Sequence, residues 1–162
     1  MVFQGAALFD SLTVGENIAY PLREHLRELS EADITARVAK NLKMVNLPGI
    51  EQMRPSDLSG GMRKRVGLAR AIAIEPEVIL YDEPTTGLDP ISTKVIDELI
   101  VSMKHQLGCT SIVVTHDMDS AFRVSDRMAM LAKRKIVASG TVEEMQASTN
   151  PDVRAFFDAR KS

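Results

Sequence analysis

The sequence predicts an α/β domain with a mainly parallel sheet, combined with a helical zone, and three observations support this fold class. Short apolar runs at residues 78–81 and 111–114 predict buried strands, and each run ends in polar residues. Apolar residues recur at helical spacing between and after these runs. Asp89-Pro90 and similar pairs are typical of helix starts. This alternation of strand and helix indicates a parallel sheet.

The first part of the chain, residues 1–21, predicts a strand end followed by loops. Met1-Val2-Phe3 is apolar, Gln4-Gly5 predicts a turn, and the loop continues through Asp10-Ser11. Because an independent domain rarely opens on an apolar strand, we expect this chain to be part of a longer protein.

The second part, residues 22–75, predicts helices. Ser30 and Asp33 form a predicted capping box, and Pro48-Gly49 marks the end of the helix behind it. A second helix is expected after Ser59, before Pro76. The predicted core-facing residues of the two helices are Ile34, Val38, Leu42, Val45, Met62, Val66, Ala69 and Ile72.

The third part, residues 76–162, contains the two predicted buried strands. The helix that begins at Asp89-Pro90 has a predicted apolar stripe of Ile91, Val95, Leu99 and Met103. Later elements are a helix at 118–124, strands at 128–131 and 136–138 joined by the charged turn 133–135, a capping box from Thr141 to Glu144, and a helix from Asn150-Pro151 carrying Val153, Phe156 and Phe157.

Composition excludes several classes of protein. The chain has 162 residues, 44% of them hydrophobic and 26% charged, with a net charge of −2, so it has no basic surface for nucleic acid or anionic lipid. Aromatic residues make up 4% and tryptophan is absent, which argues against base stacking. The single cysteine, Cys109, excludes an internal disulfide framework and predicts a buried core thiol in a reducing cytoplasm. No apolar run reaches the roughly 18 residues that span a bilayer, so we expect a soluble protein that meets the membrane through a partner.

Two carboxylates, Asp82 and Glu83, follow the apolar run at 78–81. Ligands bind at this edge of open α/β sheets. An aspartate there can hold hydrated Mg²⁺, and an adjacent glutamate can orient or deprotonate a water aimed at a phosphate. A strand followed by a solvated acidic loop has the same pattern, so both interpretations stay open at this point.

Two further polar features have both a functional and an ordinary interpretation. Ser59-Gly60-Gly61 precedes a helix, whose N-terminus offers free N–H groups to an anion, although a plain serine cap has the same sequence. His116 follows the second predicted strand, at the same sheet edge as Asp82, and could donate to a phosphate oxygen or have no role. We expect no function for the other two histidines, His25 and His105.

These elements occur in an order that resembles the ATP-binding cassette (ABC) family, and the resemblance covers essentially the whole chain. Gln4 is similar to the Q-loop glutamine, residues 58–62 resemble the LSGG signature, Asp82-Glu83 resembles Walker B with its catalytic glutamate, residues 87–89 resemble the D-loop, and His116 the switch histidine.

The resemblance implies a role for each matched residue and implies ATP and Mg²⁺ as cofactors. Asp82 would hold Mg²⁺ through water, Glu83 would act as general base, Gln4 would sense the metal and the attacking water, and His116 would contact the γ-phosphate. Ser59, Gly60 and Gly61 would bind the γ-phosphate of ATP held by a second copy of the ATPase, with Asp89 at the interface between the copies. The helical zone would dock on a transmembrane permease.

One departure from the family is serious: the phosphate-cradling loop G-x-x-x-x-G-K-[ST] is absent from the sequence. The family places that loop, and the aromatic residue that stacks on adenine, before the Q-loop. We therefore expect a partial P-loop NTPase-like domain without its Walker A portion, starting at an internal methionine. Alone, it should neither bind ATP tightly nor hydrolyse it, and its exposed apolar surface and strand edge should favour self-association.

Residues 5–14 and 16–24 are similar to one subgroup, the Mla-type ATPases of phospholipid-trafficking and organic-solvent-tolerance systems. The resemblance implies transport of lipid or hydrophobic compounds, at the inner face of the cell membrane. It also implies an MCE-type lipid-binding protein as a partner in the complex.

The sequence also bears on three other functions. ABC-class motors of DNA repair or chromosome organisation carry long coiled-coil or zinc-bearing insertions, and this chain has neither heptads nor paired cysteines. A non-hydrolysing module that docks on a permease or partner ATPase stays open, because the phosphate loop is missing. A glycosidase is excluded, since neighbouring residues on a strand point to opposite sides and cannot face each other across a sugar.

Overall fold

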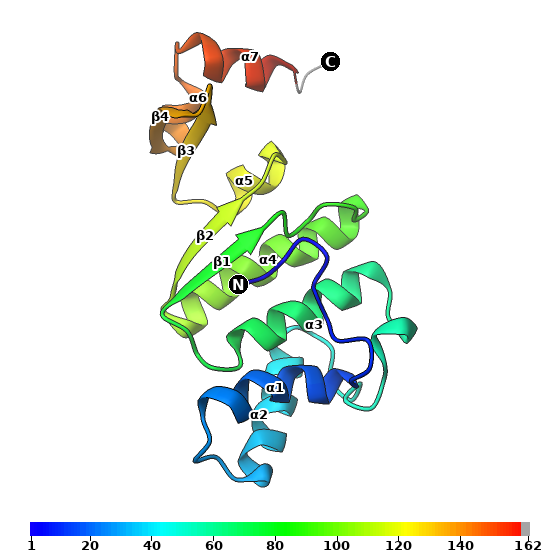
Figure 1. Ribbon diagram of the computed structural model, residues 1–162. Coiled ribbons are helices and arrows are strands. Elements are labelled where there is room, and N and C mark those ends of the chain that lie inside the picture. Colours follow the sequence, from blue (N-terminus) through cyan, green and yellow to red (C-terminus); the bar gives the residue numbers. More distant parts are fainter. Residues whose placement is uncertain (160–162) are drawn as a thin grey trace. The chain divides into compact units, whose positions relative to one another are not determined.

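A computed structural model describes residues 1–159 of the chain (Figure 1). By its internal contacts the chain divides into two compact units, Met1–Thr115 and His116–Ser162, and each is described by itself. Among the described residues, no helix is long and apolar enough to cross a membrane.

Three helices of the first unit pack against one another: α1 (Val14–His25), α2 (Glu31–Met44) and α3 (Gly60–Ile72) (Figure 1). A short 3-10 helix, η1 (Pro55–Asp57), precedes α3. Each helix contributes apolar side chains that are fully buried, as expected of amphipathic helices in a core: Val14, Ile18, Leu22, Leu42, Val66, Leu68 and Ile72.

Helix α1 corrects the expected start of the helical zone, which was placed near residue 22. The helix begins at Val14, where Thr13 and Glu16 form a capping box: the Thr13 hydroxyl accepts from the Glu16 N–H, and the Glu16 carboxylate accepts from the Thr13 N–H. Pro21 lies inside the helix and suggested a boundary, because proline usually ends a helix. The capping sequence was the signal that could have located α1.

The other two helices start as predicted. Ser30 and Asp33 form the expected capping box of α2, and the Ser59 hydroxyl accepts from the Met62 N–H at the start of α3. Helix α2 ends at Met44, before Pro48-Gly49, because Asn46 takes a left-handed conformation (φ 57°). Of the predicted core-facing residues in both helices, all but Met62 are buried, and Met62 is half-buried.

A small parallel sheet forms from β1 (Val78–Asp82) and β2 (Thr110–Val114), connected by α4 (Pro90–Leu107). Val2 joins its edge as a single parallel bridge to Tyr81. The Val2 N–H donates to the Leu80 carbonyl at 2.7 Å, and the Asp82 N–H donates to the Val2 carbonyl at 2.9 Å. The opening of the chain therefore behaves as the strand end that its sequence predicts.

The predicted burial of both strands was wrong for one face of the sheet. Ile79 and Tyr81 are buried, whereas Val78, Leu80, Ile112 and Val114 are 51%, 42%, 51% and 59% exposed. Helix α4 lies along the sheet (Figure 1). The opposite face has no covering layer within residues 1–115, so its apolar side chains reach the surface.

The apolar stripe of α4 also differs from the prediction. Ile91 is 79% exposed, in the first turn of the helix, and Val95 is half-buried. The buried apolar residues are Ile96, Leu99, Ile100 and Met103, a stripe that starts one turn later. Cys109, after the Gly108 cap, is buried as expected.

The second unit contains α5 (Met118–Val124), β3 (Arg127–Ala132), β4 (Lys135–Thr141), α6 (Val142–Gln146) and α7 (Pro151–Ala159). The two strands form an antiparallel hairpin, so the predicted parallel arrangement is limited to β1 and β2. Its turn residues Lys133 and Arg134 both have positive φ, as two-residue hairpin turns require. The predicted capping box of α6 is present, and Phe156 of α7 is 43% exposed whereas Val153 and Phe157 are buried.

Candidate functional site

Asp82 and Glu83 lie at the carboxyl tip of β1, as predicted. Asp82 is the last residue of the strand, and both residues are half-buried. The Glu83 N–H donates to the Val114 carbonyl at 2.9 Å, which joins the residue after β1 to the end of β2. Glu83 has a φ of 46°, a left-handed conformation that costs a residue with a side chain about 1 kcal/mol or more. Such a conformation persists only where surrounding contacts hold it, and it is typical of functional sites.

The Glu83 carboxylate is held by two hydroxyl groups. Its Oε2 accepts from Thr86 Oγ1 at 3.0 Å and from Thr115 Oγ1 at 3.4 Å. These donors come from the loop after β1 and from the residue after β2, so two segments set the position of one carboxylate. Neither threonine belongs to a motif that the sequence predicts, although Thr86 lies only three residues after Glu83 in the same loop.

Lys64 of α3 approaches the same loop through its backbone. Its Nζ donates to the carbonyl of Thr86 at 2.7 Å and to that of Glu83 at 3.3 Å. Burial lowers the pKa of Lys64, and the charge of Glu83 acts in the opposite direction. No motif in the sequence marks this residue, because its contacts join segments 19 and 22 residues apart.

Gln4 begins the turn that follows the Val2 bridge, and it is exposed. Because Val2 runs parallel to β1 and pairs with Tyr81, Gln4 leaves the sheet at the same edge as Asp82 and Glu83. The structure therefore brings these three predicted site residues to one edge.

Helix α3 also holds the turn that contains Gln4. Ala6 and Ala7 have positive φ values of 63° and 47°. Arg70 of α3 donates through Nη2 to the Ala6 carbonyl at 2.9 Å and through Nη1 to the Ala7 carbonyl at 2.8 Å. Its guanidinium carbon lies 5.8 Å from the centre of the Phe9 ring, a cation–π contact.

The turn at Ser59 lies against the segment that contains Asp89. A Cβ added at Gly61 would lie 3.4 Å from Ser92 Oγ, and one at Gly60 would lie 3.9 Å from a methyl carbon of Leu88. Both Ser59 and Gly60 are exposed at the N-terminus of a 13-residue helix. The small residues keep this helix end accessible to an anion, although the Ser59 hydroxyl also caps the helix, so the ordinary interpretation holds as well.

Asp89 is the N-cap of α4. Its Oδ1 accepts from the N–H groups of Ile91 and Ser92, both at 2.9 Å, and its Oδ2 accepts from Ser92 Oγ at 2.6 Å. These hydrogen bonds lower the pKa of Asp89, and those from Ser92 have the largest effect. The Asp89 carboxylate therefore stays charged at neutral pH. The structure thus joins the Ser59 turn to Asp89 through Ser92.

His116 is the first residue of the second unit, and it is exposed. Its grouping with Asp82 and Glu83 therefore stays a prediction. The histidines expected to have no role are both exposed, His25 in the last turn of α1 and His105 in the last turn of α4.

The donor set fits Mg²⁺ only in part. Within residues 1–159, no group of three or more His, Cys, Asp or Glu side chains could hold a metal ion. Mg²⁺ usually keeps several waters and binds one or two carboxylates together with substrate phosphates, so a single Asp82 suits that arrangement. The backbone cradle for a triphosphate is not supplied, since the sequence lacks the phosphate loop.

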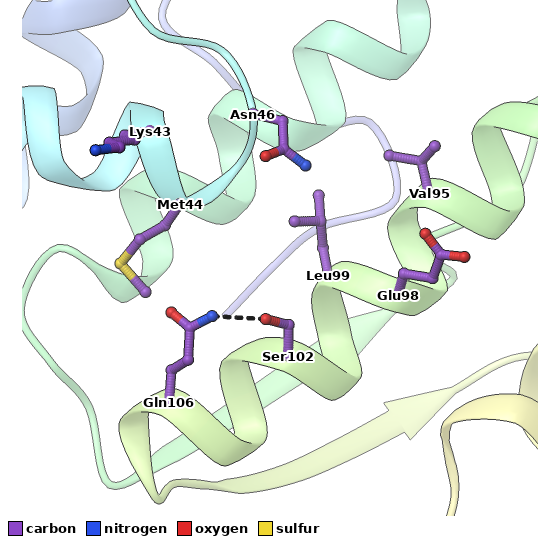
Figure 2. A pocket seen from close by; sticks show the side chains of 8 residues that line it. All are labelled: Lys43, Met44, Asn46, Val95, Glu98, Leu99, Ser102 and Gln106. Carbon is purple, nitrogen blue, oxygen red and sulfur yellow. Dashed lines mark hydrogen bonds between the residues drawn. The ribbon is translucent and has the colours of Figure 1, made fainter.

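A separate groove of about 370 Å³ lies between the end of α2 and α4 (Figure 2). Lys43, Met44 and Asn46 line one side, and Leu99 and Gln106 lie on the other, where Gln106 Nε2 donates to Ser102 Oγ at 2.7 Å. None of the predicted site residues lines this groove. The groove is therefore not the site that the motifs predict.

Comparison with known proteins settles the family. The family model described as ABC transporter matches residues 1–86, more than half of the chain. The chain belongs to the ABC transporter family. The matched part of this ABC transporter chain includes Gln4, the Ser59 turn, Asp82 and Glu83, and it ends before Asp89 and His116.

Curated relatives agree with the predicted subgroup. The chain is 44% identical to the intermembrane phospholipid transport system ATP-binding protein MlaF of Escherichia coli K12, over 98% of this chain and 58% of MlaF. It is 42% identical to the probable ribonucleotide transport ATP-binding protein mkl of Mycobacterium tuberculosis H37Rv, over 99% of this chain and 45% of mkl. The similarity to Mla-type ATPases is confirmed, and the chain spans about half the length of these relatives.

Solved structures confirm the fold. The ATP-binding cassette MJ0796, in a dimeric post-hydrolysis state bound to ADP and Pi, superposes with a TM-score of 0.77 at 34% identity, over 87% of this chain and 61% of the cassette. A second dimeric structure of MJ0796, described as a bacterial ABC transporter cassette, gives a TM-score of 0.78. The chain therefore has the fold of part of an ABC ATPase cassette, as predicted.

Proposed function

We propose that this chain is part of the ATP-hydrolysing motor subunit of an ABC transporter that moves lipid or other hydrophobic compounds. The observation that carries the proposal is the grouping of Gln4, Asp82 and Glu83 at one sheet edge, in a chain 44% identical to MlaF. The name of MlaF supports phospholipid as the substrate class, and the name of mkl, a probable ribonucleotide transporter component, supports transport more generally.

Glu83 is the proposed general base. Its carboxylate, oriented by Thr86 and Thr115, would take a proton from the water that attacks the γ-phosphate. Asp82 would bind Mg²⁺ through water, and the bound metal would neutralise charge on the phosphates. Gln4 would contact the metal shell and the attacking water, and His116 would donate to the γ-phosphate.

Ser59, Gly60 and Gly61 are the proposed site for the γ-phosphate of ATP held by a second copy. The accessible N-terminus of α3 supports this role, because its free N–H groups and dipole favour an anion. Asp89, joined to this turn through Ser92, would lie at the interface between the copies. The solved MJ0796 cassettes are dimeric, which supports the pairing of two copies.

We propose that the permease contacts the aromatic pair Phe9 and Tyr20. Their ring centres are 5.1 Å apart, and the residues are 44% and 46% exposed. Arg70 connects Phe9 to the turn that contains Gln4, so movement at the nucleotide could reach this surface. An MCE-type lipid-binding protein would belong to the same complex, at the inner face of the cell membrane.

The chain has three proposed functional parts: the Q-loop region at residues 1–21, the helical subdomain with the signature at 22–75, and the C-terminal part of the catalytic core at 76–162. Helix α1 crosses the first of these boundaries, so the Q-loop region and the helical subdomain share one element.

The test is calorimetric titration with Mg-ATP of this chain and of a version extended at its N-terminus by the preceding segment of MlaF. We expect tight binding only by the extended version, because the segment supplies a phosphate loop. In that version, Glu83→Gln should lower ATP hydrolysis roughly 100-fold or more while binding persists. Glu98→Gln, a change of the same kind on the exposed surface of α4, should leave hydrolysis unchanged.

Three results would contradict the proposal. Tight binding by the short chain would mean that unidentified residues contact the triphosphate. Binding without hydrolysis by the extended version would favour the second candidate, a non-hydrolysing module that docks on a permease or partner ATPase. Equal loss of hydrolysis in Glu83→Gln and Glu98→Gln would remove Glu83 from the role of base.

A further inference from the structure

Lys64 occupies an unusual position for a lysine, since it is half-buried and its ammonium group bonds only to backbone carbonyls in the contacts described above. Buried lysines are uncommon and normally have partners that offset the loss of hydration. Here the partners are the carbonyls of Glu83 and Thr86, which lie at the two ends of a single turn.

We infer that Lys64 is a positioning residue that links the signature helix α3 to the Glu83 loop and fixes the position of the Glu83 carboxylate. The inference rests on the proposed function of Glu83 as base.

Several hydrogen bonds join Lys64, Glu83 and Thr86 around this loop. The Thr86 N–H donates to the Glu83 carbonyl at 3.3 Å, and the Thr86 hydroxyl donates to the Glu83 carboxylate at 3.0 Å. The Lys64 ammonium bonds both carbonyls, at 2.7 and 3.3 Å, so it restrains the residue that holds the carboxylate as well as Glu83 itself. Hydrogen bonds from a charged donor are roughly twice as strong as neutral ones.

The Glu83 backbone needs this support. With a φ of 46°, the residue lies in the left-handed region, which persists only where surrounding contacts hold it. Two of those contacts are the Val114 carbonyl, which accepts from the Glu83 N–H, and Lys64, which donates to the Glu83 carbonyl. One fixes the loop to the sheet, and the other fixes it to α3.

The same helix carries the proposed γ-phosphate site five residues before Lys64. A Cβ added at Gly61 would lie 3.4 Å from Ser92 Oγ, and Ser92 bonds Asp89, so α3 comes close to the segment 83–92 near both of its ends. The close approach at Gly61 and the two hydrogen bonds of the Lys64 ammonium connect α3 to this segment. Occupancy of the Ser59 turn can thereby influence the carboxylate at Glu83.

Hydrogen exchange of this chain, measured by mass spectrometry, tests the inference with Lys64→Met and Lys64→Arg. Methionine keeps most of the apolar stem and removes the donors, whereas arginine keeps charged donors. The readout is exchange in residues 83–88 relative to exchange in α2, so that a general loss of stability cancels. Lys94→Met, an exposed lysine of α4, is the matched control.

We expect Lys64→Met to raise this ratio about tenfold, which corresponds to the loss of a hydrogen bond to a charged group. Lys64→Arg and Lys94→Met should stay within about threefold of the unmodified chain. A ratio in Lys64→Met equal to that of the unmodified chain would overturn the inference, because the stem alone would then hold the loop. An increase in Lys64→Arg as large as in Lys64→Met would also overturn it.

A second measurement needs no variant in the site. In the unmodified chain, NMR of the lysine ammonium groups should show slower proton exchange at Lys64 than at Lys94, and equal rates would contradict the inference.

A third measurement uses the MlaF-extended version, in which Lys64→Met should lower kcat with KM for ATP changed less than twofold. If no version binds ATP, the proposed function fails, while the exchange ratio still decides the role of Lys64.

Discussion

A Cβ added at Gly67 would lie 3.2 Å from both the Cβ and the carbonyl oxygen of Ala6. Helix α3 therefore meets the turn that contains Gln4 so closely that a methyl group at Gly67 would require a shift of a few tenths of an ångström. One turn later on α3, Arg70 bonds the carbonyls of Ala6 and Ala7. Since Lys64 of the same helix bonds the Glu83 loop, α3 contacts the segments that contain two of the three predicted catalytic residues, Gln4 and Glu83.

Gly67→Ala should lower the free energy of unfolding by about 1–2 kcal/mol in urea denaturation. Overpacking costs about 1–3 kcal/mol, and the better helix propensity of alanine recovers up to about 1 kcal/mol. Adding Ala6→Gly should restore part of the loss, because it removes one of the two clashing atoms and glycine suits the φ of 63° at that position. A Gly67→Ala variant that is more stable than the unmodified chain would mean that the Gln4 turn moves freely.

Features of the site that depend on residues close together in the chain were predicted from the sequence, whereas contacts between distant segments were not. Ser59 and Asp89 cap their helices as predicted, and Asp82 and Glu83 end a strand, since each of these features depends on neighbours in the chain. The contacts of Lys64 with the Glu83 loop join segments 19 and 22 residues apart, and no spacing rule predicts them.

Burial was harder to predict than element type. The apolar runs at 78–81 and 111–114 predicted strands correctly, but a run of apolar residues does not show which layer covers each face, and one face is exposed. Helix α1 begins before the predicted helical zone and contains Pro21, because a proline can lie within a helix whose other residues pack on a core.

Asn17→Asp should destabilise the first unit by about 3 kcal/mol, measured by urea denaturation. Asn17 is fully buried, and its amide nitrogen donates to the carbonyls of Phe9, Leu12 and Thr13 at 3.1, 3.3 and 2.9 Å. An aspartate has the same shape, but its carboxylate cannot donate and would place a charge against three carbonyl oxygens.

Asn46→Asp is the matched control for this change. Asn46 is exposed and has a left-handed backbone, a conformation that aspartate tolerates. The free energy of unfolding of the Asn46→Asp variant should therefore stay within about 0.5 kcal/mol of that of the unmodified chain. Equal stability of both variants would mean that Asn17 does not hold the loop from Phe9 to Thr13.

Tyr81 should titrate late in a near-ultraviolet absorbance titration of phenolate. Burial raises the pKa of Tyr81 to about 12, with the Ser111 hydroxyl acting in the opposite direction. The chain has two tyrosines and no tryptophan, so the late step is readily observed. Tyr81→Phe should remove it, and Tyr20→Phe should leave it in place.

The same shift predicts how stability depends on pH. Because the phenol loses its proton near pH 10 in the unfolded chain and near pH 12 in the folded chain, its contribution is fully present below about pH 10 and is lost as pH rises toward about 12. The loss should reach about 2–3 kcal/mol in the unmodified chain relative to Tyr81→Phe. Parallel stability curves for the two proteins above about pH 10 would contradict the burial of Tyr81.

The exposed face of the parallel sheet should make the chain self-associate. Leu80 and Ile112 are directly paired across β1 and β2, and they are 42% and 51% exposed. Apolar side chains grouped on one face favour association, so the average mass in sedimentation equilibrium should rise above 17.8 kDa as concentration increases. Replacing both residues by threonine keeps strand propensity and should return the mass to that of one chain.

The control variant is Ile91→Thr, which removes an isolated apolar residue that is 79% exposed on α4. This variant should associate like the unmodified chain. If Ile91→Thr lowers the average mass as much as the double threonine variant, the surface that associates does not lie on this face of the sheet. If the unmodified chain has the mass of one chain at every concentration, this face has no affinity for a second copy.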